Sequence, residues 1–83
     1  MVTAESGAVA RRIGADIRRR MSERGMDYDQ LAIQTGIGRS MLHRIATGHR
    51  TKWLEQEYME VIAHALETTS EELLSAGYDL NDR

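Results

Sequence analysis

Residues 27–48 read DYDQLAIQTGIGRSMLHRIATG and contain two short helical patterns on either side of a glycine-marked break. The first pattern covers residues 28–34 and the second covers residues 39–46. In the second pattern Leu42 and Ile45 lie three residues apart and share one helical face. We therefore predict two short helices that bury one face each.

The break between the two patterns is residues 35–38, Thr-Gly-Ile-Gly. Gly36 suits the left-handed conformation that ends a helix, and Gly38 is a modest N-cap for the next helix. Ile37 is apolar, so we expect it to fix the turn to a core. Asp27 is expected to cap the first of the two helices. Two helices joined by so short a turn are typical of a helix-turn-helix.

The order and spacing of these residues resemble the Cro/C1-type (lambda-repressor-like) helix-turn-helix family. The matching residues are Leu31-Ala32, Gly36-Ile37, Ser40, Leu42, Arg44-Ile45 and Gly48. The usual tail of the family is matched by AHAL at 63–66 and SEELL at 70–74. The resemblance covers about residues 9–75. It implies an all-α, compact five-helix domain that binds double-stranded DNA. The expected function is that of a sequence-specific transcriptional regulator, a repressor of the phage immunity or Cro-like kind, which reads the major groove with helix 39–46.

Composition agrees with one helical domain. The chain has 83 residues, no Cys and no Pro, which excludes disulfides and thiolate metal sites. No apolar run approaches the ~18 residues of a membrane span, and the first residues lack the apolar region of a signal peptide. We expect no membrane association and a cytoplasmic, nucleoid-associated protein. A bacterial or phage origin follows from the resemblance alone.

Charge is divided unevenly along the chain. Residues 1–52 hold ten Lys or Arg and five Asp or Glu. Residues 53–83 hold one Lys or Arg and eight Asp or Glu. The first part is thus net +5 and the second net −7, although the whole chain is only −2. A basic half of this kind is typical of a nucleic-acid-binding face, and chance segregation on a solvated surface is the alternative.

We divide the chain into a flexible arm (1–7), the DNA-binding domain (8–77) and a C-terminal tail (78–83). A first helix is expected from an N-cap at Thr3 or Ser6 to about residue 24. Its apolar stripe is Val9, Ile13, Ile17 and Met21, flanked by Ala10 and Gly14.

A fourth helix is expected over 53–67, with Leu54, Tyr58, Val61, Ile62, Ala65 and Leu66 inward. A fifth begins at a Thr69–Glu72 capping box, is anchored by Leu73 and Leu74, and ends at Gly77.

The resemblance implies that the third helix reads bases with Arg39, Ser40 and Arg44, together with His43. An arginine fork matches O6 and N7 of guanine, which supports this assignment for Arg39 and Arg44. Ser40 is equally expected to contact a phosphate or to cap the helix locally. The alternative for His43 is an ordinary polar surface residue without a base contact.

Phosphate contacts are expected from the start of the second helix and from the loop after the third. The candidates are Arg50 and Lys52, followed by His49 and Tyr28. Tyr28 stands where the family usually has Gln, and its hydroxyl would have to replace the amide. One arginine of the 18–20 run is a further candidate.

Two other departures from the family pattern concern packing. Gly38 replaces the usual Ser, Thr or Asp cap of the third helix. Met21 and Ala46 occupy positions where the family often has an Arg–Glu pair, so we expect apolar packing in place of a buried ion pair.

One small domain offers few contacts, so we expect a homodimer on a two-fold-symmetric operator. By resemblance the dimer surface lies on the last two helices and the tail, near Tyr78 and Leu80. Trp53 either packs over the core or joins that surface. No metal, no cofactor and no catalytic residue is expected, so the chain is not predicted to be an enzyme. The alternative function is an antitoxin or other protein-interaction module of the same fold.

Overall fold

The structure is a computed structural model, which describes the backbone of residues 2–49 and 56–78 and the side chains of residues 9–49 and 57–77. Its described part contains five α-helices and no strand. They are α1 (Val2–Glu23), α2 (Tyr28–Thr35), α3 (Arg39–Ala46), α4 (Gln56–Ala65) and α5 (Ser70–Tyr78). The predicted all-α, five-helix fold is therefore confirmed.

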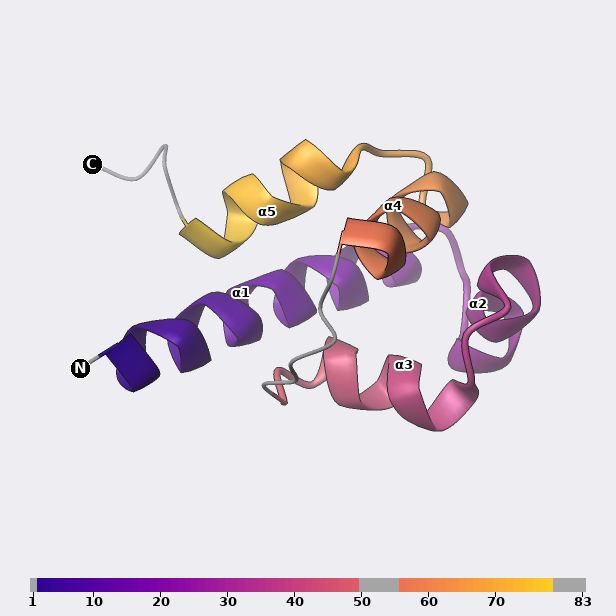
Figure 1. Ribbon diagram of the computed structural model, residues 1–83. Helices are drawn as coiled ribbons and strands as arrows, with labels where there is room; N and C mark the ends of the chain where they lie inside the picture. The colour runs from indigo at the N-terminus through magenta and orange to yellow at the C-terminus, as the bar shows by residue number, and fades with distance from the viewer. Residues whose placement is uncertain (1, 50–55, 79–83) are drawn as a thin grey trace.

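The five helices close a ring of contacts. α1 packs on α3 and α5, α2 packs on α3 and α4, and α4 packs on α5. Figure 1 shows α1 as the long diagonal element, with α5 on one side of it and α3 on the other. Because α1 touches both, it holds the first half of the domain to the second.

The core lies inside this ring and is entirely apolar among the described residues. Its members are Ile13, Ile17, Met21, Leu31, Ile37, Leu42, Ile45, Ala46, Met59, Ile62, Ala63, Leu66 and Leu73. Met21 and Ala46 are both buried, which agrees with apolar packing where the family often has a buried ion pair. The predicted stripe of α1 is confirmed, since Ile13, Ile17 and Met21 are buried and Val9 is partly buried.

Three details of the predicted helices are wrong. α1 starts at Val2, so neither Thr3 nor Ser6 caps it, and residues 2–7, expected in an arm, continue the helix. Residues 2–8 lack Pro and contain Ala4 and Ala8, which favour helix. α4 ends at Ala65 rather than residue 67. Its predicted start at residue 53 and Leu54 lie outside the described residues.

The third error concerns which face of α4 and α5 is inward. Met59 is buried and Val61 is 40% exposed, so the stripe of α4 is rotated from the expected one. Leu73 is buried whereas Leu74 is 40% exposed, because adjacent helical residues point about 100° apart. The predicted cap of α5 is half confirmed: the Glu72 amide donates to Thr69 Oγ1 at 3.1 Å.

Candidate nucleic-acid interface

The turn between α2 and α3 has the geometry that its two glycines predict. Gly36 has a φ of 77° and donates its N–H to the carbonyl of Ala32, which ends α2. Ile37 is buried and pins the turn to the core. Gly38 is the extended N-cap of α3 and provides no side-chain cap. Thr35 adds a link that the sequence did not reveal, because its hydroxyl donates to Leu31 and accepts from the Ile37 amide.

α3 is held by one face and leaves the other free. Leu42, Ile45 and Ala46 are buried. On the α1 side, a Cβ added at Gly14 would lie 2.6 Å from the carbonyl oxygen of Ala46, so only glycine permits this approach of the two helices. This packing holds α3 in place and leaves its polar side chains exposed to solvent, while Met41 is partly buried against the core.

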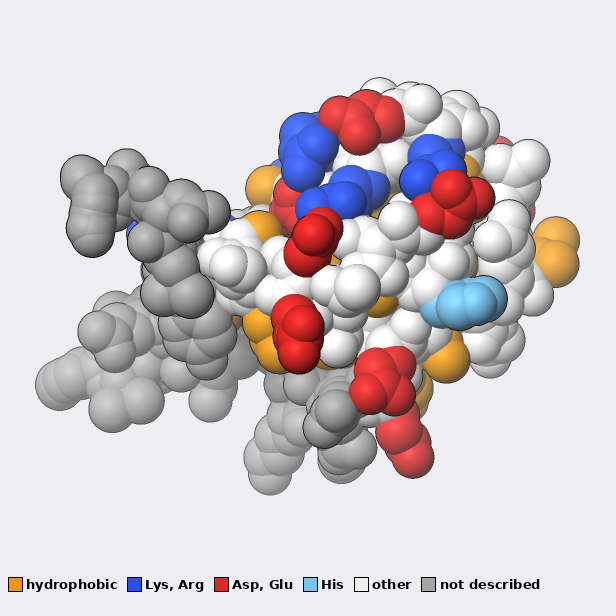
Figure 2. All heavy atoms as spheres, turned by 90° about the horizontal axis from the view of Figure 1, so that it is seen from above, with side chains coloured by type: hydrophobic (Ala, Val, Ile, Leu, Met, Phe, Trp, Pro, Cys, Tyr) orange, Lys and Arg blue, Asp and Glu red, His pale blue; other side chains and the backbone are white. Residues whose placement is uncertain are grey.

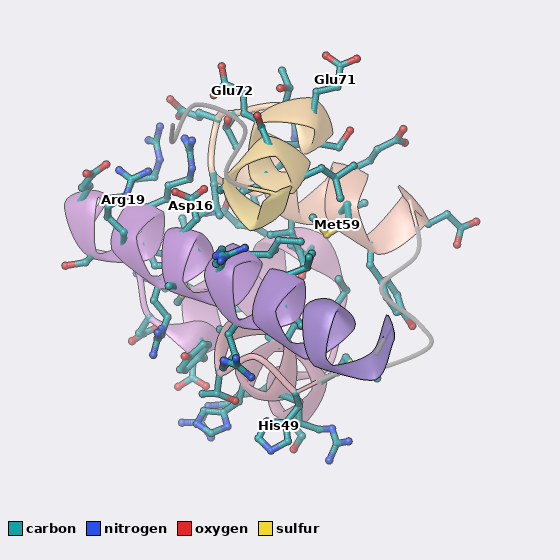
Figure 3. All side chains as sticks on the ribbon, turned by 90° about the vertical axis from the view of Figure 1, so that its left-hand side faces the viewer. Asp16, Arg19, His49, Met59, Glu71 and Glu72 are labelled. Carbon is teal, nitrogen blue, oxygen red and sulfur yellow. The ribbon has the colours of Figure 1, made fainter. Side chains whose placement is uncertain are left out.

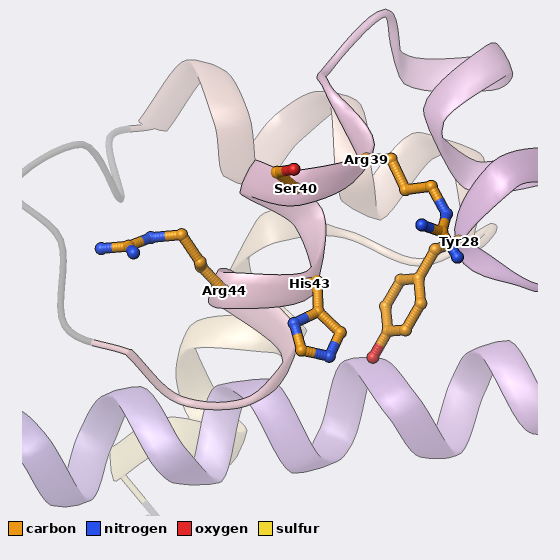
Figure 4. Close-up of a pocket in the computed structure, with 5 residues that line it drawn as sticks. All are labelled: Tyr28, Arg39, Ser40, His43 and Arg44. Atoms are coloured by element: carbon orange, nitrogen blue, oxygen red, sulfur yellow. The ribbon is translucent and has the colours of Figure 1, made fainter.

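The exposed side of α3 carries all four candidate base readers: Arg39, Ser40, His43 and Arg44 are exposed. Together with Tyr28 they line one open hollow between α2 and α3 (Figure 4). The fold thus brings together five of the eight residues to which the sequence assigned DNA contacts.

The candidates differ in their partners. Arg39 forms an ion pair with Asp29, in which Nε lies 2.7 Å from Oδ1. The ring of His43 meets that of Tyr28 edge to face, with centroids 5.3 Å apart. Arg44 extends away from Arg39, His43 and Tyr28 (Figure 4), and it makes no ion pair with a described residue. Arg44 is therefore the freer of the two arginines.

The start of α2 is less suited to a phosphate than we expected. Asp27 accepts from the Gln30 amide at 2.9 Å, and the Gln30 side chain accepts from the Asp27 amide at 3.3 Å. This capping box uses N–H groups that an anion would otherwise bind. The carboxylates of Asp27 and Asp29 add negative charge, and the Tyr28 hydroxyl is a donor that the capping box leaves available here.

α3 ends in a Schellman motif around Gly48, whose φ is 86°. The His49 amide donates to the Arg44 carbonyl and the Gly48 amide to the Ile45 carbonyl. A Cβ at Gly48 would lie 2.9 Å from Arg11 Cα, so the end of α3 rests on α1. The motif holds His49 next to α3. Arg50 and Lys52, the other two loop candidates, lie outside the described residues.

This arrangement agrees with the comparison with known families. The model of the Cro/C1-type HTH DNA-binding domain matches residues 16–77, which is most of the chain. The chain belongs to this family. The comparisons with curated proteins and with solved structures gave no match. Membership makes DNA the class of partner for this Cro/C1-type domain.

The three arginines at positions 18–20 of α1 fall into two groups. Arg19 pairs with Asp16 and Glu23, and Arg20 with Asp16 and Glu72. The hydrogen bond from Arg19 to Asp16, and after it the one to Glu23, raises the pKa of Arg19 above its ordinary value. Arg18 makes no ion pair with the part of the chain that the structure describes. It lies four residues after Gly14, on the side of α1 next to α3. Of the 18–20 run, Arg18 is thus the cation left for a phosphate.

The opposite edge of the Cro/C1-type domain is acidic. Figure 3 shows Glu71 and Glu72 on α5, across α1 from His49. Figure 2, seen from above α4 and α5, shows acidic side chains spread over this face, some of them beside Lys or Arg. The predicted dimer residues cannot be placed here, because Leu80, Trp53 and the Tyr78 side chain lie outside the described residues.

Within residues 2–49 and 56–78, no three His, Asp or Glu side chains are grouped so as to hold a metal ion. In the same ranges, no helix has the length and apolar character needed to cross a bilayer.

Proposed function

We propose that this Cro/C1-type domain is a sequence-specific regulator of transcription that inserts α3 into the major groove of double-stranded DNA. One observation carries the proposal. The buried face of α3 fixes the helix, while Arg39, Ser40, His43 and Arg44 stand together on its exposed face. An α-helix fits the major groove, and the N-terminal residues of a recognition helix reach base edges there.

The regulator acts as a repressor in this proposal. Repression by occlusion needs only tight binding over a promoter, and this fold supplies a binding face. The domain acts as a homodimer on a two-fold-symmetric operator, with half-sites roughly one helical turn (~34 Å) apart. Its place is the nucleoid of a bacterium or of a phage-infected cell.

Phosphate contacts position the helix in this proposal. The contributors are the Tyr28 hydroxyl, His49, Arg50 and Lys52, with Arg18 of α1 in addition. Their charges lie in the basic first half of the chain, whereas Glu71 and Glu72 lie on the far edge (Figure 3). The protein would therefore approach DNA with its α3 side.

The proposal is tested by selection from a pool of random duplexes at two salt concentrations. A dimeric regulator enriches a short two-fold-symmetric motif, and its affinity falls steeply as salt rises. Weak and equal binding to all duplexes contradicts the proposal.

The acidic edge favours a second candidate, an antitoxin-like module that binds a basic protein. Glu71 and Glu72 are exposed there, away from α3, so such a partner would leave the DNA face open. A pull-down that recovers a basic protein, with no sequence enrichment in the duplex selection, would support this candidate over the repressor.

A further inference from the structure

One ion pair joins the two helices of the helix-turn-helix at their first turns. Nε of Arg39, the first residue of α3, lies 2.7 Å from Oδ1 of Asp29, the second residue of α2, and the two side chains form an ion pair. The two side chains are 67% and 69% exposed. An ion pair in such contact with water contributes little to stability. Because Arg39 lines the hollow between α2 and α3, a role of the pair in binding is the better explanation.

The closest contact of the pair is made by Nε, at one edge of the guanidinium. The terminal nitrogens Nη1 and Nη2 of Arg39 donate no hydrogen bond to a residue that the structure describes. The guanidinium is planar and its donors form a rigid fork, so holding Nε next to the carboxylate restricts where the whole group can lie. The two terminal nitrogens then present parallel donors, which is the arrangement that binds O6 and N7 of guanine.

A free arginine has many rotamers and loses their entropy when it binds a base. Asp29 removes part of that freedom before DNA arrives. The neighbouring Tyr28 also lines the hollow, and Figure 4 shows Arg39 extending toward it. Arg44 has no such support from a described carboxylate, so the two arginines of α3 differ in how far they are preorganised.

We propose that Asp29 is a positioning residue that holds Arg39 for guanine recognition in the major groove. The inference rests on the proposed function and deepens it, because it assigns a guanine to Arg39 and a supporting carboxylate from α2. Asp29 itself touches no base in this account. Its carboxylate also lies near the DNA backbone, so its presence lowers non-specific affinity while it raises base discrimination.

The test measures base preference with the full chain by selection from random duplexes. Arg39→Ala first identifies the guanine that Arg39 reads, as the position where preference is lost. Two variants of Asp29 are then compared. Asp29→Ala and Asp29→Asn remove the same charge, but only the asparagine keeps a side-chain oxygen, an acceptor, opposite Arg39 Nε. Melting by circular dichroism checks that both exposed-site variants remain folded.

We expect Asp29→Ala to lower the guanine preference at that position at least about fivefold, the lower end for a bidentate arginine contact. Asp29→Asn is expected to lose less preference than Asp29→Ala. Both variants are expected to bind non-specific duplexes somewhat more tightly, because one negative charge is gone. In the Arg39→Ala background, Asp29→Ala is expected to change no preference further.

Three results overturn the inference. If Arg39→Ala changes no guanine preference, Arg39 is not the reader. If Asp29→Ala keeps or sharpens the preference, the pair restrains Arg39 rather than positioning it. If both Asp29 variants change affinity equally on all duplexes, the effect is one of charge alone. When the wild-type chain enriches no motif, the proposed function fails as well, whereas loss of the inference alone leaves a wild-type motif intact.

Discussion

A Cβ at Gly14 would lie 2.6 Å from the carbonyl oxygen of Ala46 and 2.8 Å from that of Ile45. The helix that we propose for base reading is thus seated, at its C-terminal end, directly on the backbone of α1. Because the obstacle is backbone, neither helix accommodates a side chain here without moving.

Gly14→Ala should therefore destabilise the domain, although alanine favours helix. Overpacking against fixed atoms costs ~1–3 kcal/mol, against a helix-propensity gain of about 1 kcal/mol. We expect a net loss of about 1 kcal/mol in chemical denaturation and weaker specific DNA binding as α3 shifts. Ser22→Ala, at an exposed position of α1, serves as the control with little change. A stabilised Gly14→Ala variant would show that the two helices are not in this contact.

Glu67 holds a backbone conformation that glycine prefers. Its φ is 58°, and it ends α4 in a Schellman motif in which the Thr68 amide donates to Ala63. Glu67→Gly should raise the free energy of unfolding by about 0.5–1 kcal/mol, because it removes left-handed strain. Glu67→Gln keeps the strain and removes only the exposed pair with Arg24, so it should change stability by less than about 0.5 kcal/mol. Equal effects of the two variants would contradict the strain argument.

Arg18 and Arg19 are neighbours with different surroundings. Arg19 is balanced by Asp16 and Glu23, whereas Arg18 pairs with no described residue. Arg18→Ala should lower the salt slope of DNA binding by about one, as expected for one lost phosphate contact. Arg19→Ala is the matched control and should leave the slope unchanged. If only Arg19→Ala lowers the salt slope of DNA binding, the phosphate contact lies on the other side of α1.

Base readers and phosphate binders should differ in how their removal affects sequence preference. Arg44→Ala should relax preference at one operator position and cost ~1–3 kcal/mol on the selected site. Lys52→Ala should weaken all sequences alike and lower the salt slope by about one. Competition with mutated operators at constant salt separates the two. An Arg44→Ala variant with unchanged specific affinity would rule out this arginine as a reader.

The sequence predicted the helix-turn-helix itself in detail. Gly36 and Gly38 located the turn, Ile37 fixed it to the core, and Asp27 capped α2, all as observed. These features are local, since each depends on residues within one or two turns of the chain. Local chemistry therefore determines where α2 ends and α3 begins.

The face of α4 could not be predicted in the same way. Its sequence has two overlapping apolar stripes, one with Val61 and the other with Met59 and Ala63. Both satisfy helical spacing, and contact with α2 and α5 decides between them. The structure buries Met59 and exposes Val61, a result that only the neighbouring helices could determine.

The pairing within the site was also beyond the sequence. Asp29 and Arg39 are ten residues apart, and they meet only because the turn folds α2 back against α3. The sequence identified Arg39 as a candidate but gave no sign that a carboxylate of α2 pairs with it. The same holds for the T-shaped contact of Tyr28 and His43, which links the two helices a second time.

The central claim is that α3 reads the major groove, and base analogues in the selected operator test it most directly. The analogues replace the guanine at the operator position where Arg44→Ala relaxes base preference. There, 7-deazaguanine lacks the N7 acceptor in the major groove, and inosine lacks the amino group in the minor groove. We predict that 7-deazaguanine weakens wild-type binding about fivefold or more, and that this loss disappears in Arg44→Ala. Inosine should have little effect. Binding that is weakened by inosine but not by 7-deazaguanine would contradict the account, because it would place the protein in the minor groove.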